Sequence, residues 1–160
     1  MICPISRGGA IDASGYNDHG RRYIVYKVDG NAIGHGGACG NTIPPIVSTP
    51  IVIQPVEADG ITLALGSREL LDNNGEADQG IIEAPSLVRM ESKWILFFSS
   101  GCFATKHYTV SYATSNSIAG PYTRADKPLF KTGDDGVFAP GVVLSTQQIL
   151  DSQLPSEDKC

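Results

Sequence analysis

Two carboxylates recur in matching surroundings of this 160-residue chain. Asp12 lies in the run IDA at 11–13, and Glu83 lies in the run IEA at 82–84, 71 residues later. A pair of carboxyl groups that face one cavity can divide acid and base work, because one holds a proton while the other stays ionised. Hydrolysis of a glycosidic bond requires such an arrangement. The alternative is that each carboxylate is an ordinary strand-start residue that accepts hydrogen bonds from loop amides.

The elements that would position these carboxylates also repeat. At the same displacement of 71, the run YIVY at 23–26 becomes WILF at 94–97. A third start, VFAPGVV at 137–143, parallels IEAPSLV at 82–88. Repeats of short strands at this length are typical of β-propeller blades, whose first strands line a central channel. The two carboxylates would then face one channel.

Turn-forming residues divide the chain into short segments and favour an all-β fold. Glycine and proline together supply 28 of the 160 residues, which leaves little room for long helices. We expect no helix of ten residues before the C-terminal tail. Alternating and β-branched runs predict strands at 10–16, 23–28, 46–54, 61–65, 68–71, 82–89, 93–99 and 107–114.

The repeat divides the chain into about two blades and the start of a third. We expect one blade over residues 3–71, the next over 72–132, a third start over 133–145 and a non-propeller tail over 146–160. Two blades and a stub cannot close a ring, because repeat units bury their apolar faces only against neighbours. We therefore expect the native polypeptide to be longer than this chain.

Composition and charge exclude several classes of partner. With 41% hydrophobic and 18% charged residues the chain is globular, and its net charge is −5 with no cluster of Lys or Arg. Nucleic acid and anionic membrane surfaces are therefore poor partners. Residues 1–4, MICP, have neither the basic nor the apolar region of a signal peptide. We expect no membrane segment either.

The four cysteines and three histidines show no metal-ligand spacing. The cysteines at 3, 39, 102 and 160 form no CxxC pair, so we expect no metal site in this chain. A disulfide-bearing secreted protein is compatible with four cysteines, but they allow three pairings and the sequence selects none of them.

An ordered set of segments resembles a known family. The segment CPISRGGAIDASGYNDHGRRYIVYKVDGNAIGHGGACGNTIPPIVSTP at 3–50 is similar to the second blade of the fungal enzymes of glycoside hydrolase family 43. The segment IIEAPSLVRMESKWILFFSSGCF at 81–103, continuing through VSYATSNSIAGPYTRADKPLF at 110–130, is similar to their third blade. These enzymes are five-bladed propeller arabinanases, arabinofuranosidases and xylosidases. The resemblance covers roughly residues 3–143 and implies an incomplete segment of that fold.

The resemblance implies a role for each carboxylate. Glu83 matches the general acid that protonates the glycosidic oxygen, and Asp12 matches the aspartate that modulates the pKa of that acid. The family inverts configuration and takes its general base from the first blade, yet no residue before Asp12 is acidic. The chain alone is therefore expected to have little or no activity. The parent enzyme would be a secreted hydrolase of arabinose- or xylose-containing plant polysaccharides. It would need no cofactor, although the complete fold can hold a calcium ion, for which no ligand is identified here.

Three further residues have both a functional and a structural interpretation. His35, in the GHGG run at 34–37, could contact sugar hydroxyls, or the run could simply need glycine conformations. Phe103 could stack on a sugar face or pack in the core. Lys27 could form a salt bridge to a channel carboxylate, or it could be a rim lysine in water.

Two other kinds of function remain open. The same carboxylates could bond sugar hydroxyls in a non-catalytic carbohydrate-binding propeller segment, or the propeller could serve protein interactions only. The sequence does not distinguish arabinofuranose from xylose, or endo from exo action. The expected partner in either sugar-directed case is an arabino- or xylo-oligosaccharide or polysaccharide.

Overall fold

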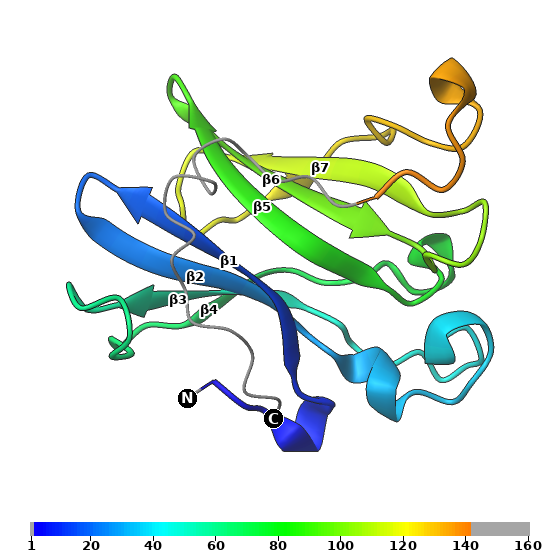
Figure 1. The fold of residues 1–160 in the computed structure, drawn as a ribbon, viewed down its shortest axis with the longest axis horizontal. Coiled ribbons are helices and arrows are strands. Elements are labelled where there is room, and N and C mark those ends of the chain that lie inside the picture. Colours follow the sequence, from blue (N-terminus) through cyan, green and yellow to red (C-terminus); the bar gives the residue numbers. More distant parts are fainter. Residues whose placement is uncertain (1, 142–160) are drawn as a thin grey trace.

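The computed structural model describes residues 2–141 as two four-stranded antiparallel sheets (Figure 1). Each sheet takes its strands in chain order, as expected for a propeller blade. The first sheet contains β1 (Ala10–Asp18), β2 (Arg21–Val28), β3 (Ile51–Val56) and β4 (Arg68–Leu71). The second contains β5 (Ile82–Met90), β6 (Lys93–Ser100), β7 (Thr109–Ser115) and β8 (Thr123–Arg124).

The predicted all-β fold is confirmed. Helical structure in the described residues is confined to 3-10 segments of three or four residues, and no helix there is long and apolar enough to cross a membrane. The segments are η1 (Ile5–Arg7), η2 (Gly30–Ile33), η3 (Ala38–Gly40), η4 (Gly75–Asp78) and η5 (Asp134–Gly136).

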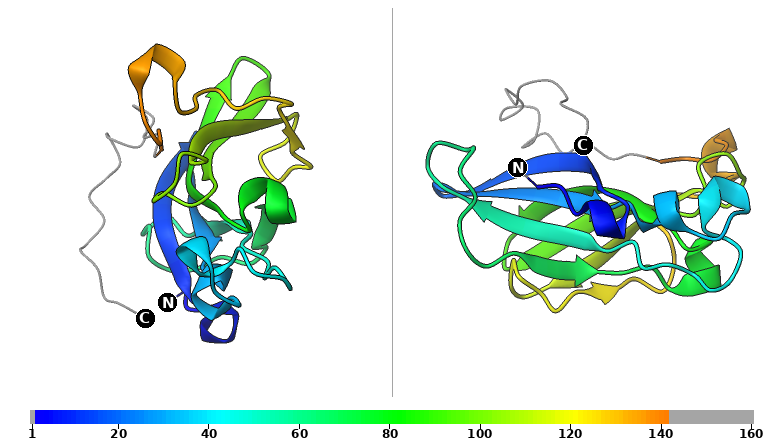
Figure 2. Two further views of the ribbon diagram at one scale, coloured as in Figure 1. Left: turned by 90° about the vertical axis from the view of Figure 1, so that its right-hand side faces the viewer. Right: turned by 90° about the horizontal axis from the view of Figure 1, so that it is seen from below.

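The main core lies between the two sheets, which stack as two layers (Figure 2). Val25 and Ile53 of the first sheet belong to the same buried cluster as Leu87, Leu96 and Phe98 of the second. Burying an aliphatic or aromatic side chain of this size contributes roughly 1.5–3 kcal/mol. The packing of the two sheets therefore fixes the first strand of each one relative to the other.

The two leading hairpins match each other at a displacement of 72, not 71. Asp18 pairs with Arg21 at the tip of the first hairpin, and Met90 pairs with Lys93 at the tip of the second. The difference between 90 and 18 gives the displacement of 72. The predicted displacement of 71 is therefore wrong by one residue.

Each first strand contains the same local irregularity, and the displacement of 72 holds on both sides of it. The pairing register shifts between Ile11 and Ser14 in β1 and between Glu83 and Ser86 in β5. A left-handed residue lies within each shift: Asp12 has a φ of 55° and Ala84 a φ of 49°. Asp12 is thus equivalent to Ala84, and the two carboxylates do not occupy the same place in the two strands.

The third predicted start has the same local backbone. Ala139 has a φ of 46°, close to that of Ala84, within the parallel run that the sequence indicated. Of that run, residues 137–141 are described, and the predicted tail 146–160 lies outside the described residues.

Two predicted strands differ from the observed ones. The run 46–54 forms a strand only from Ile51, because the prolines at 44, 45 and 50 lack an amide hydrogen for a sheet ladder. The run 61–65 forms no strand, and Leu65 is 99% exposed. Its start is held in a turn, because the Asp59 carboxylate accepts hydrogen bonds from the backbone N–H groups of Ile61 and Thr62.

A disulfide joins the two blades at the end of the sheets where β1 and β5 begin. Cys39, in the loop after β2, is bonded to Cys102, two residues after the end of β6. Because β2 and β6 run antiparallel to the first strands, both loops leave the sheets beside Asp12 and Glu83.

Candidate active site at the junction of two blades

The first strands of the two blades meet where they carry their carboxylates. Asp12 Oδ2 accepts a hydrogen bond of 3.0 Å from the backbone N–H of Ala84, the residue after Glu83. Two residues further along β1, Ser14 Oγ donates a 2.8 Å hydrogen bond to the carbonyl of Pro85. The sequence-predicted pair is therefore brought together, although not by equivalent positions.

The backbone at Asp12 is part of this arrangement. A left-handed conformation is uncommon for residues other than glycine, and aspartate adopts it more readily than most. Because it lies inside the register shift of β1, the side chain reaches across to the β5 backbone.

The surroundings of Asp12 raise its pKa above the ordinary aspartate value. Burial of the carboxyl group is the largest cause, and the neighbouring charges of Glu83 and Asp29 act in the same direction. The hydrogen bond from the Ala84 N–H and the charge of Lys27 oppose them without reversing the shift. Asp12 is therefore a group that retains its proton to a higher pH than a free aspartate.

Each oxygen of the Glu83 carboxylate has its own donor. Tyr108 Oη donates a hydrogen bond of 2.8 Å to Oε1, and Lys27 Nζ lies 3.1 Å from Oε2. The side chain is 16% exposed, so the carboxyl group is largely enclosed but still reachable from solvent. Because Tyr108 and Lys27 contact different oxygens, together they fix the orientation of the carboxyl plane.

Lys27 is fully buried, so the interpretation as a rim lysine is wrong and the predicted salt bridge is present. Its side chain has 0% exposure, and its Nζ forms ion pairs with Glu83 and, at 3.1 Å, with Asp29 Oδ1. A buried ammonium group requires such partners, because desolvation of an unpaired charge is very unfavourable. Lys27 comes from β2 and Glu83 from β5, so this contact crosses the blade junction.

Tyr108 completes the environment of Glu83 from the second blade. The residue is buried, and burial is the main cause that raises the pKa of its hydroxyl, while a hydrogen bond with the Ser99 side chain acts against it. A Cβ at Gly141 would collide with the Tyr108 ring, so only glycine fits there. The start of the third unit thus packs directly behind the residue that holds Glu83.

Sequence reasoning missed Asp29 and Tyr108. Asp29 follows β2 in the run KVDG, and Tyr108 immediately precedes β7, where its alternation with Val110 and Tyr112 indicated only a strand. No local sequence pattern indicates that either residue lies in the environment of Glu83. The Tyr108–Glu83 contact joins segments 25 residues apart, and Asp29 is linked to Glu83 through Lys27.

The two residues predicted to bind substrate lie on loops at the same end of the sheets. His35 is exposed, and its Nδ1 is 2.8 Å from the carbonyl oxygen of Pro45, which leaves Nε2 facing outward from that contact. Phe103 is 67% exposed and follows Cys102, so the interpretation as a core residue is wrong. The Cys39–Cys102 disulfide connects their loops.

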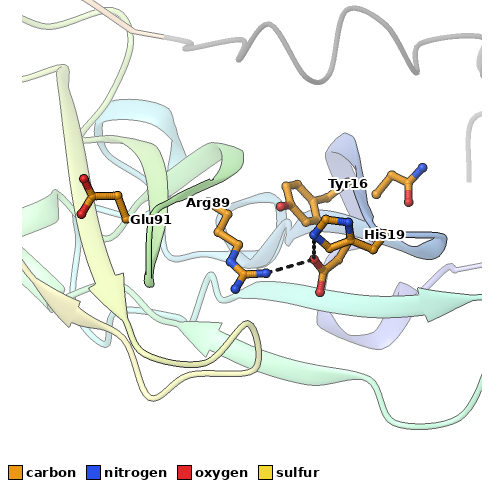
Figure 3. A pocket seen from close by; sticks show the side chains of 6 residues that line it. Tyr16, His19, Arg89 and Glu91 are labelled. Carbon is orange, nitrogen blue, oxygen red and sulfur yellow. Dashed lines mark ion pairs between the residues drawn. The ribbon is translucent and has the colours of Figure 1, made fainter.

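A hollow between the two hairpin tips lies away from these carboxylates. It has a volume of about 420 Å³ and is lined by Tyr16, Asp18, His19, Arg89 and Glu91, among others (Figure 3). An ion pair of 3.6 Å joins Arg89 and Asp18 there. Because the tips are at the far ends of β1 and β5, this hollow does not belong to the Glu83 site.

Solved structures of related fold are similar to this chain. A thermostable family-43 glycoside hydrolase matches with a TM-score of 0.70 and 23% identity, over 84% of this chain and 43% of that one. An endo-1,4-beta-xylanase from Bacteroides thetaiotaomicron matches with a TM-score of 0.67 and 20% identity, over 84% and 43%. An alpha-L-arabinofuranosidase from Lactobacillus brevis matches with a TM-score of 0.59 and 16% identity, over 78% and 36%.

These likenesses establish the fold, with the two sheets of this chain as two blades of a propeller. The chain spans less than half the length of each of the three structures. A search of curated proteins gives no match. The family model for glycosyl hydrolases family 43 matches residues 1–142, most of the chain. This chain therefore belongs to the glycosyl hydrolases of family 43.

Proposed function

We propose that this chain is the part of a glycoside hydrolase that supplies the general acid and its modulating carboxylate. The reaction is hydrolysis of O-glycosidic bonds in arabinose- or xylose-containing plant polysaccharides, with inversion of configuration. The observation that carries the proposal is the contact across the blade junction, where Asp12 bonds the residue after Glu83.

Glu83 has the properties of the proton donor. Its carboxyl group is fixed at both oxygens, is largely enclosed, and remains reachable from solvent. A general acid needs this combination, because the proton must be delivered to a leaving oxygen within hydrogen-bond reach. Asp12 is the modulator: its own raised pKa arises in part from the Glu83 charge, and the interaction between two carboxylates is mutual.

Inversion requires a further carboxylate that activates water on the opposite face of the sugar. In the family resemblance that residue belongs to another blade, so we propose that the 160-residue chain by itself hydrolyses its substrate weakly. A positioned base contributes roughly 10²–10⁴-fold to the rate.

The substrate class is supported by the similar structures, which include an endo-1,4-beta-xylanase and an alpha-L-arabinofuranosidase. His35 and Phe103 are proposed to contact the sugar from the loops beside the carboxylates. An exposed aromatic ring and an imidazole are common sugar contacts, since one stacks on the ring face and the other bonds hydroxyls.

We also propose that the protein acts outside the cell. The Cys39–Cys102 bond supports this proposal, because disulfides persist mainly in oxidising compartments.

The test compares leaving groups in the wild-type chain and in Glu83→Gln. Cleavage of an arabino- or xylo-oligosaccharide needs a proton on the departing sugar oxygen, whereas a dinitrophenyl glycoside releases a stable anion without one. Azide, a nucleophile that needs no general base, is added to both reactions to replace activated water. We expect Glu83→Gln to lose roughly 10²–10⁴-fold on the oligosaccharide and far less on the dinitrophenyl glycoside.

Equal losses on both substrates, or strong residual cleavage of the oligosaccharide, would overturn the assignment of Glu83 as acid. Oligosaccharide binding by calorimetry, with no azide-dependent cleavage in the wild-type chain, would instead support the carbohydrate-binding alternative. Asp72→Asn is the matched control, because the Asp72 carboxylate accepts hydrogen bonds from Ser48 and Thr49. We expect it to leave the ratio of the two cleavage rates, oligosaccharide to dinitrophenyl glycoside, unchanged.

A further inference from the structure

Lys27 is among the largest fully buried side chains of the described residues, and it carries a charge. Its ammonium group is the one cation in residues 2–141 that forms an ion pair with Glu83. Its second partner, Asp29, lies two residues further along the same chain segment. Burial of a charged side chain is unfavourable unless opposite charges lie beside it, so the two carboxylates next to Lys27 must stabilise its ammonium group.

Four ionisable groups surround Glu83 from the elements packed around it. Lys27 and Asp29 come from β2 and the loop after it, Asp12 from β1, and Tyr108 from the loop before β7. One of the four is a cation and two are carboxylates, so Lys27 alone offsets the negative charge of the group.

We propose that Lys27 is a positioning residue for Glu83 and that Asp29 is its permanent counter-ion. Lys27 holds Glu83 Oε2 across the blade junction, while Asp29 keeps Lys27 charged and in place whenever Glu83 carries a proton. This inference rests on the proposed role of Glu83 as the general acid.

The need for a second carboxylate follows from the reaction cycle. A general acid alternates between its protonated and ionised forms in every turnover. If Glu83 were the only partner of Lys27, each protonation would leave a buried ammonium group without a counter-ion. Asp29 removes that penalty, so Glu83 can gain and lose its proton while Lys27 stays where it is.

The same geometry assigns the proton to one oxygen of Glu83. An ammonium group has three donors and no acceptor, so a proton on Oε2 could not be donated to Lys27 Nζ, and the ammonium group disfavours a proton there. Oε1 faces the Tyr108 hydroxyl, which can either donate or accept. The proton therefore lies on Oε1, and Tyr108 turns from donor to acceptor, or releases Oε1, when Glu83 is protonated.

The test measures the titration of the Glu83 carboxyl carbon by NMR in the full 160-residue chain labelled with ¹³C-glutamate. Glu83→Gln identifies the Glu83 signal by its disappearance. In Lys27→Met the midpoint of that titration moves up by about one pH unit or more, because a neighbouring cation favours the ionised carboxylate. In Asp29→Asn the midpoint moves down, because one repelling charge is lost and Lys27 is left to Glu83 alone.

Lys27→Arg keeps the cation and stays much closer to the wild-type midpoint than Lys27→Met does. Asp126→Asn removes an exposed carboxylate near β8 and leaves the midpoint unchanged. Opposite shifts in Lys27→Met and Asp29→Asn are the signature of the proposal, since general loosening of the site would move both in one direction.

An unmoved midpoint in Lys27→Met, or an upward shift in Asp29→Asn, overturns the proposal. If Lys27→Met does not fold, the direction of the Asp29→Asn shift decides alone. The measurement needs no turnover, so it is independent of the azide assay. The azide assay shows whether Glu83 fails as the acid, and the NMR titration shows whether Lys27 fails as its positioning residue.

Discussion

The β1–β2 hairpin and the β5–β6 hairpin have the same backbone plan and carry different chemistry on it. Each has a first strand with a register shift and a left-handed residue inside that shift. In the first blade the left-handed residue is itself the carboxylate, Asp12. In the second blade it is Ala84, and the carboxylate is Glu83, one residue earlier. A single repeated backbone thus presents two carboxyl groups from different places. Within residues 2–141, donors contact both oxygens of Glu83 and one oxygen of Asp12.

The second strands show the same division of tasks. Lys27 lies opposite Ile11 in the first hairpin, and Ser99 lies opposite Glu83 in the second, so the two residues are equivalent at the displacement of 72. Lys27 contacts Glu83 directly, while Ser99 bonds Tyr108, which in turn bonds Glu83. The equivalent positions of both blades therefore support one residue, Glu83. The backbone repeats between the blades, but the charged residues on it do not.

The largest stability effect is expected where the two blades share their core. Leu96 has 0% exposure and packs in the cluster that joins the sheets. Leu96→Ala should lower the free energy of unfolding by about 2–5 kcal/mol, because it removes buried area and leaves a cavity. Urea denaturation measures the change.

Leu65→Ala is the matched control for that substitution. Leu65 is 99% exposed, so its truncation should change the free energy of unfolding by no more than about 0.5 kcal/mol. Equal effects of the two truncations would show that the blades do not share a core.

The disulfide is expected to have the next largest effect. Replacing Cys39 and Cys102 together with serine should lower the free energy of unfolding by about 2–4 kcal/mol, because the bond closes a chain segment with a separation of 63 residues. Equilibrium denaturation of the double variant and of the wild type without reductant checks this value. An unchanged denaturation midpoint would mean that noncovalent contacts alone stabilise the blade junction and that the disulfide adds nothing.

Asp12→Asn is expected to have a small effect of defined sign. The folded-state pKa of Asp12 is raised above its unfolded value, so folding favours its protonated form, and that contribution is present at low pH and lost as the pH rises through the folded pKa. Asparagine resembles the protonated form. The variant should therefore be slightly more stable than the wild type near neutral pH, with the difference vanishing as the pH falls below about 4.

Thermal denaturation of both proteins across that pH range measures the difference. A variant that is less stable at neutral pH, or a difference that grows on acidification, would contradict the raised pKa. In the same variant, the acid limb of the proposed hydrolysis should shift, since Asp12 no longer carries a charge beside Glu83.

Local sequence patterns were sufficient for the fold class and for both leading hairpins, because turn residues and alternation act over short distances. The pairing of Asp12 with Glu83 was also predictable, from the repeat and from the family resemblance. The offset between them was not, since the pairing register, which sets the displacement of 72, leaves no mark in the composition of a strand. The apolar run 61–65 misled for the opposite reason: its composition is that of a strand, but the Asp59 turn determines its backbone.

Most of the environment of Glu83 lay beyond the reach of sequence reasoning, although a salt bridge to a channel carboxylate was one of the two interpretations of Lys27. Lys27, Asp29 and Tyr108 are each 25 to 56 residues from Glu83 in the chain. The Lys27 contact needs the two blades to pack, and the Tyr108 contact needs the second blade to fold. Composition places lysine at surfaces by default, so a buried lysine is visible only in three dimensions.

The central claim is that Asp12 and Glu83 form one electrostatically coupled site across the blade junction. The most direct test is the ¹³C NMR titration of the Asp12 side-chain carboxyl carbon in the wild type and in Glu83→Gln, with the Asp12 signal identified by Asp12→Asn. We expect the pKa of Asp12 to lie above the ordinary aspartate value in the wild type and to fall in Glu83→Gln, because the Glu83 charge is one of the causes that raise it. The same Asp12 midpoint in both proteins would contradict the claim.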